Sequence, residues 1–222
     1  MPTKAERPSE GGSVVPPRVT DSLRELHLFA GAGGGILGGL LLGHTPVCAV
    51  EVDAYCRKVL EAWQADGWLP EFPIYQDVRE FDGKPWRGRV DVVAGGFPCQ
   101  PWSQAGKRKG TDDPRHLWPE MARIVKEVRP RYVFAKNVQL DAMREPWRDL
   151  RGLGYRVPPA LCVAAADVGA PHLRKRWWLL ATDADSDAIR IQHQSRTSRT
   201  QAETAWRYLA QQIVDTMPTQ ND

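Results

Sequence analysis

The chain has 222 residues, 42% of them hydrophobic, which suffices for one globular domain with its own core. A formal net charge of +3 is too small to indicate a polyanionic partner by itself. The 4 cysteines include no Cys-x-x-Cys pair, and we find no signal peptide or long apolar span. The sequence therefore argues against a zinc finger, a secreted protein or a membrane partner, and it predicts a cytoplasmic location.

Residues 1–22 mix Pro and Gly with polar residues and lack apolar periodicity, so we expect a disordered leader. Strand-like and helix-like segments then alternate through residues 23–183, which predicts one doubly wound, mostly parallel α/β sheet. The expected strands are 26–30, 47–52, a short one near 74, 90–94, 131–135, 160–165 and 177–181. The expected helices are 34–42, 54–65, 117–128 and 147–153.

The first predicted strand leads into a glycine-rich turn at residues 29–35. Glycine there lets the backbone approach a ligand closely, and the following helix start favours negative ligand groups. Glu51 ends the second strand about 20 residues later, where an acid can bridge ribose hydroxyls. Asp77 follows the third strand and can accept from an adenine amino group. These features predict a nucleoside cofactor, either a nicotinamide dinucleotide or an adenosyl sulfonium; the alternative is a turn that serves helix packing alone.

Cys99 lies in the segment Gly95-Gly96-Phe97-Pro98-Cys99-Gln100, directly after a predicted buried strand. Its neighbours are residues that shape the backbone, and the carboxyl end of a parallel strand is where open α/β sheets bind ligands. We interpret Cys99 as a presented nucleophile. Cys48, Cys56 and Cys162 lie in apolar or amphipathic segments and are expected to pack as small hydrophobic residues.

Basic residues gather at 107–109 and 174–176, with Trp102, Trp118, Trp177 and Trp178 beside them. Such a combination suits a groove for nucleic acid, although solvated loops often have the same composition. Residues 184–222 are expected to form a polar linker and an amphipathic helix. Thr200 and Glu203 form a capping box there, and apolar residues between 202 and 213 share one helical face.

Together these motifs resemble the catalytic half of the DNA (cytosine-5) methyltransferase family, over roughly residues 23–183. The set comprises Phe29 to Gly35, Glu51, Asp77, Pro98-Cys99-Gln100, Asn137-Val138 and Arg174-Lys175-Arg176. The resemblance implies a Rossmann-like sheet of the S-adenosylmethionine-dependent methyltransferase type. It also implies S-adenosyl-L-methionine as cofactor, cytosine-containing duplex DNA as substrate, and DNA methylation of the restriction-modification kind.

The resemblance further implies a mechanism, in which a Cys99 thiolate adds to carbon 6 of a flipped cytosine so that carbon 5 can accept a methyl group. Residues 103–115 would close over the DNA, Arg176 would contact the oxygen of the base, and Arg174 would support Arg176. The implied catalytic residues are Cys99, Lys136, Asn137, Arg174 and Arg176. The implied cofactor-binding residues are Phe29, Ala32, Gly33, Gly34, Glu51, Val52, Asp77, Val78, Pro98 and Leu117, and no metal site is implied.

Several positions depart from the family pattern. Lys136 replaces a glutamate that bonds ring nitrogen 3 and the exocyclic amine, and an ammonium cannot accept from that amine. Its positive charge would favour the Cys99 thiolate, yet loss of the carboxylate should slow the reaction by roughly 10² to 10⁴. His172 stands where glutamine is usual, and Val52 where an aromatic residue often stacks on adenine. We expect the chain to lack the target recognition domain and the C-terminal family segments.

These departures leave alternatives open. The chain is either a DNA (cytosine-5) methyltransferase with impaired activity, or a non-catalytic or degenerate homologue that binds cofactor or DNA. It is otherwise the larger half of a split enzyme, whose second polypeptide supplies target recognition. An enzyme that uses a carboxylated S-adenosylmethionine, paired with Lys136, is a further alternative. A nicotinamide oxidoreductase is disfavoured, because it would leave Cys99 and the Arg-Lys-Arg cluster without a role.

Overall fold

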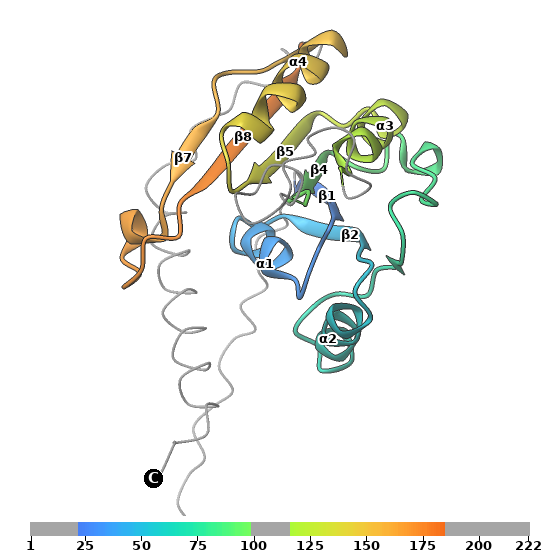
Figure 1. Cartoon of the computed structure of the whole chain (residues 1–222). Helices are drawn as coiled ribbons and strands as arrows, with labels where there is room; N and C mark the ends of the chain where they lie inside the picture. Colours follow the sequence, from blue (N-terminus) through green and yellow to red (C-terminus); the bar gives the residue numbers. More distant parts are fainter. Residues whose placement is uncertain (1–21, 99–115, 185–222) are drawn as a thin grey trace, which may run out of the picture.

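A computed structural model describes residues 22–98 and 116–184 of the chain (Figure 1). Cys99, the predicted loop 103–115, the basic cluster 107–109 and the predicted helix after Thr200 lie outside the described residues. The predicted leader lies outside them too, except for Ser22, whose hydroxyl donates to the carbonyl of Gly43 at 2.8 Å.

Within residues 22–98 and 116–184, the centre of the fold is an eight-stranded sheet with the order β3-β2-β1-β4-β5-β8-β6, and β7 pairs with β8. Strands β1 to β5 pair in parallel, and β8 runs antiparallel to β5, β6 and β7. The strands are β1 Arg24–Leu28, β2 Thr45–Val50, β3 Ile74–Tyr75, β4 Val92–Gly95, β5 Tyr132–Asn137, β6 Tyr155–Arg156, β7 Leu161–Val163 and β8 Arg176–Asp183. The predicted mostly parallel α/β sheet is therefore confirmed.

Helices lie on both faces of this sheet (Figure 1). They are α1 Gly34–Leu41, α2 Ala54–Ala65, α3 Trp118–Val128 and α4 Arg144–Gly152, with short 3-10 turns η1 Lys84–Trp86, η4 Asp141–Met143 and η5 Ala165–Val168. Side chains of α3 and α4 join Leu26 and Leu28 of β1 in the larger core. Ile36 of α1 and Leu60 of α2 join Ala49 of β2 in a smaller core on the other face.

Helix α2 has the predicted bounds, because the Asp53 side chain accepts from the amide of Cys56 and caps it. Helix α4 begins at Arg144 rather than 147, since Pro146 is tolerated in a first helical turn, where no intrahelical bond needs its missing N–H. The strand predicted over residues 160–165 is shorter in the structure, where β7 spans Leu161–Val163. There the Asp167 carboxylate accepts from the amide of Ala164 and starts the 3-10 turn.

Three strand ends differ from prediction in ways that matter for the site. Strand β2 ends at Val50 rather than at residue 52, so Glu51 and Val52 follow the strand. The first strand ends at Leu28 rather than at residue 30, because Phe29 has a φ of 54° and already begins the turn. Strand β5 continues to Asn137 rather than ending at 135, since Lys136 and Asn137 pair with Trp178 and Trp177 of β8. Strand β6 was not predicted, and its two residues are held in the sheet by pairing with Asp183 and Thr182 of β8.

None of the helices in the described part of the chain is both long and apolar enough to cross a lipid bilayer.

Candidate active site

The register of the parallel strands brings four chain segments to one edge of the sheet. Leu28 of β1 pairs with Val50 of β2 on one side and with Gly95 of β4 on the other. Gly95 in turn pairs with Ala135 of β5. Every predicted motif that follows one of these four residues therefore starts in the same row, at the carboxyl ends of the strands.

The turn after β1 contains three residues with positive φ, namely Phe29 at 54°, Gly31 at 55° and Gly33 at 90°. For a bulky residue such as Phe29 this conformation costs on the order of 1–3 kcal/mol, and strain of this kind gathers at functional sites. Gly33 also packs against α2, because a Cβ there would lie 2.8 Å from Cδ2 of Leu60. The turn therefore requires glycine at this position for two independent reasons.

Glu51 follows β2, and its side chain reaches across to the turn after β1. One carboxylate oxygen, Oε2, accepts from the amide of Gly31 at 2.7 Å, and Oε1 accepts from the amide of Asp53 at 2.8 Å. The residue is only 9% exposed. Since a carboxylate has about four acceptor positions, each oxygen retains capacity for one hydroxyl donor.

The other predicted cofactor residues occupy varied environments. Asp77 is half-buried, and its side chain accepts from the amide of Arg79 at 2.9 Å. Val52 is 67% exposed, whereas the side chain of Val78 is buried in the larger core and only its backbone can face a ligand. Ala32, in the turn after β1, and Gly34, the first residue of α1, are exposed. Pro98 and Leu117 are half-buried.

The turn after β4 leads directly to Cys99. The ring of Phe97 is buried against Trp118, with ring centroids 5.5 Å apart. Asn137, 1% exposed, donates from Nδ2 to the Phe97 carbonyl at 3.3 Å, and its Oδ1 accepts from the amide of Val138 at 2.7 Å. Asn137 thus connects the end of β5 to the backbone just before Pro98.

Lys136 extends over the same turn. A Cβ on Gly96 would lie 2.9 Å from both Cε and Nζ of Lys136, so the glycine leaves room for this side chain. The ammonium therefore lies beside Gly96, which precedes Cys99 by three positions in the sequence.

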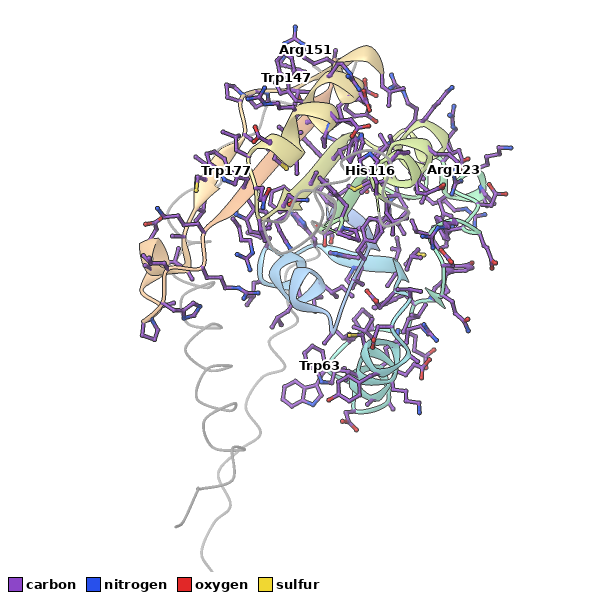
Figure 2. The ribbon with its side chains drawn as sticks, in the orientation of Figure 1. Trp63, His116, Arg123, Trp147, Arg151 and Trp177 are labelled. Carbon is purple, nitrogen blue, oxygen red and sulfur yellow. The ribbon has the colours of Figure 1, made fainter. Side chains whose placement is uncertain are left out.

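Strand β8 brings the arginine cluster to the edge that holds Asn137. Trp177 pairs with Asn137 and with Cys162, and Arg176 pairs with Val163. Figure 2 shows Trp177 on this antiparallel part of the sheet. Arg176 is half-buried as a residue, and its guanidinium donates to the Lys175 carbonyl at 2.7 Å, while Arg174 and His172 are exposed. Arg174 has a φ of 34°, a second strained non-glycine residue among the predicted site residues.

Sequence reasoning gave no role to Glu25, His27 and His44, which form a buried polar cluster beneath α1. The available signal was the alternation of polar and apolar residues in Arg24–Leu28, which shows that one face of β1 carries polar side chains.

Comparisons with known proteins agree on one family. The model of the C-5 cytosine-specific DNA methylase family matches residues 23–221. The chain is 36% identical over 169 residues to Type II methyltransferase M.Eco47II of Escherichia coli, covering 72% of this chain and 39% of that protein. It is 38% identical over 158 residues to Type II methyltransferase M.NgoMIV of Neisseria gonorrhoeae, covering 68% and 49%. The chain thus spans half or less of the length of these two curated relatives.

Solved structures show a similar fold. A DNA modification methyltransferase encoded within an E. coli prophage superposes with a TM-score of 0.61 at 26% identity, covering 77% of this chain and 49% of that one. The S. pombe Dnmt2 methyltransferase superposes with a TM-score of 0.56 at 20% identity, covering 73% and 50%. The second likeness supports the fold alone.

Proposed function

The chain belongs to the C-5 cytosine-specific DNA methylase family, and from this membership we propose that it transfers a methyl group from S-adenosylmethionine to carbon 5 of cytosine in DNA. The observation that carries the proposal is the row of paired residues Val50, Leu28, Gly95 and Ala135. Because these four residues lie in one row, the segments that follow them begin at the same edge of the sheet. These segments are the glycine turn, Glu51, the turn that leads to Pro98-Cys99, and Lys136-Asn137.

The residues present fit an adenosyl cofactor. Glu51 is buried, is held by two backbone amides, and retains acceptor capacity for the two ribose hydroxyls. The first turn of α1 has no side-chain cap, so its amides are available to a carboxylate. Asp77 would accept from the adenine amine, and Phe29, Ala32, Gly33, Gly34, Val52, Val78, Pro98 and Leu117 would line the site. When bound, the cofactor supplies a methyl group on a sulfonium.

The chemistry assigned to the chain begins at Cys99. Its thiolate forms a bond to carbon 6 of a flipped cytosine, and the electron pair of the 5,6 double bond becomes available at carbon 5. After carbon 5 has gained the methyl group it loses its proton to a base, and the carbon–sulfur bond breaks to restore the double bond and the thiolate. Asn137 positions the turn that carries Cys99, while Arg176, supported by Arg174, would donate to the base oxygen.

A covalent trapping experiment tests this proposal. A duplex with 5-fluorocytosine carries fluorine in place of the carbon 5 proton, so the final elimination is blocked and the adduct accumulates. Incubation of the full chain with this duplex and S-adenosylmethionine should give a protein–DNA band in denaturing gels. The Cys99→Ser variant should give none, and Cys56→Ser, a half-buried cysteine of α2, should behave as wild type. An adduct that persists in Cys99→Ser contradicts the assignment.

A second candidate function is cofactor or DNA binding without turnover. The position of Lys136 over Gly96 favours it, because an ammonium at this point has donors only and cannot replace the acceptor of a carboxylate. Under this alternative the chain binds S-adenosylmethionine but gives no adduct.

A further inference from the structure

Glu25 is a buried charged residue on the polar face of the central strand β1. Glu25 is 5% exposed, and His27 is 4% exposed. Oε2 of Glu25 accepts from Nε2 of His27 at 2.8 Å, and Oε1 accepts from Nδ1 of His44 at 2.6 Å. Both ring nitrogens are the donors, since an ionised carboxylate only accepts. A buried carboxylate is costly unless it is paired in this way, so the cluster acts as a unit.

The cluster lies directly against α1. A Cβ on Gly39 would collide with the Glu25 carboxylate, and a Cβ on Gly35 would lie 3.4 Å from Nδ1 of His27. Glycine at these two helical positions therefore allows α1 to approach Glu25 and His27 closely. Glycine inside a helix costs about 1 kcal/mol of stability relative to alanine. The close packing of α1 against Glu25 and His27 offsets this loss of helix propensity.

His44 connects the cluster to the other end of the helix. Its backbone amide donates to the Gly39 carbonyl at 2.9 Å, while its ring donates to Glu25. The carboxylate on β1 is thus linked both to the surface of α1 and to the segment that ends it. Helix α1 has no charged side chain of its own, and its buried residues are Ile36 and Gly39.

We propose that Glu25, with His27 and His44, is a positioning cluster that holds α1 against β1 and thereby sets the glycine turn in its cofactor-binding shape. The turn joins the end of β1 at Leu28 to the start of α1 at Gly34, so a shift of α1 displaces Gly31 and Gly33. Glu25 lies three residues before the end of β1 and packs against Gly39 of α1, so it acts through the helix. The inference rests on the proposed function for the identity of the ligand.

The test compares Glu25→Gln with Asp91→Asn in the full chain. Asp91 is a matched control, because its carboxylate also hydrogen-bonds to a residue of β1. It accepts from the amide and Nε of Arg24 at 2.9 and 2.8 Å. Calorimetric titration with S-adenosylmethionine and amide hydrogen exchange of Gly34–Leu41 are measured for both. We expect Glu25→Gln to raise Kd at least tenfold and to speed exchange in α1 selectively. Asp91→Asn should lower Tm and leave Kd unchanged.

His44→Ala guards against a Glu25 variant that does not fold, because the His44 side chain is 21% exposed and its loss removes one of the two donors. We expect a smaller rise in Kd and faster exchange at the end of α1. The inference is overturned if either variant loses stability while Kd and the exchange of α1 match those of the control. If the wild-type chain does not bind S-adenosylmethionine, the proposed function fails, and selective exchange in α1 alone decides whether the cluster holds the helix.

Discussion

Lys136 is the site residue least suited to the proposed reaction. It stands at the end of β5, where its ammonium extends over Gly96 beside the turn that carries Cys99. A positive charge near a thiol favours its thiolate form, which would assist the proposed first bond-forming step at Cys99. It cannot accept a proton or a hydrogen bond from the amine of the base, so activation of the ring is left without its acceptor.

Lys136→Glu should therefore raise the rate of tritiated methyl incorporation into cytosine-containing DNA. General acid–base groups contribute roughly 10² to 10⁴ in rate, and a gain within that range is expected if the new carboxylate reaches the base. Lys58→Glu, on the exposed surface of α2, makes the same change of charge and should have no effect. An unchanged or lower rate in Lys136→Glu, with cofactor binding intact, would refute this account of Lys136.

At the scale of residues, the location of the site was more predictable than its internal bonding. The apolar strands before Glu51 and Gly95 sufficed to predict that these positions share one edge, since parallel strands end together, while Cys99 lies outside the described residues. The left-handed Phe29 was not predictable, because a bulky residue adopts this conformation only when surrounding packing imposes it. Glu25 was missed because its contact with His44, 19 residues away, is tertiary, although His27 lies two residues away on the same strand.

At the scale of elements, α1 shows how a helix rich in glycine is retained. Gly38 and Gly39 are adjacent, yet only Gly39 faces β1, where a Cβ would collide with Glu25. Gly38 is exposed, and a Cβ there meets nothing within 4 Å. Alanine at position 38 therefore changes only the helix propensity of α1, whereas alanine at position 39 also changes the packing of α1 against β1.

Gly38→Ala should raise the free energy of unfolding by up to about 1 kcal/mol through helix propensity alone. Gly39→Ala gains the same propensity but forces α1 away from Glu25, and overpacking of this kind costs about 1–3 kcal/mol. Urea denaturation followed by circular dichroism measures both. A Gly39→Ala variant as stable as Gly38→Ala would show that α1 does not rest on the cluster.

Element boundaries could be predicted where a local signal marks them. The Asp53 cap defines the start of α2 from neighbouring residues alone. Strand β5 was predicted too short, because Lys136 and Asn137 have low strand propensity and are held in the sheet by pairing with β8. That pairing is a tertiary effect, and no local pattern near residue 136 reports it.

At the scale of the whole molecule, the buried cluster contributes to stability through its charge. Burial by itself would raise the pKa of Glu25, but the hydrogen bonds from His27 and His44 and the charges of these rings lower it to about 2 from the ordinary 4.5. The unfolded chain therefore binds more protons than the folded chain between these two values. Stability from Glu25 is fully present above pH 4.5 and is lost as the pH falls towards 2.

Acid unfolding should reveal this contribution, which is about 3 kcal/mol from roughly 1.4 kcal/mol per pKa unit. The free energy of unfolding of wild type should fall more steeply between pH 4.5 and 2 than that of Glu25→Gln. Urea titrations at a series of pH values measure both slopes. Equal slopes would mean that Glu25 is not the group whose protonation weakens the fold in acid.

The central claim is that the glycine turn and Glu51 form a site for S-adenosylmethionine at the carboxyl edge of the sheet. Calorimetric titration tests this claim most directly. The wild-type chain is titrated with S-adenosylmethionine and with NAD, and the Glu51→Gln variant is titrated with S-adenosylmethionine. We predict binding of S-adenosylmethionine, no binding of NAD, and a Kd at least tenfold higher for Glu51→Gln, with Glu61→Gln on α2 unchanged. Preferential binding of NAD, or a Glu51→Gln variant that binds S-adenosylmethionine as tightly as wild type, would contradict the claim.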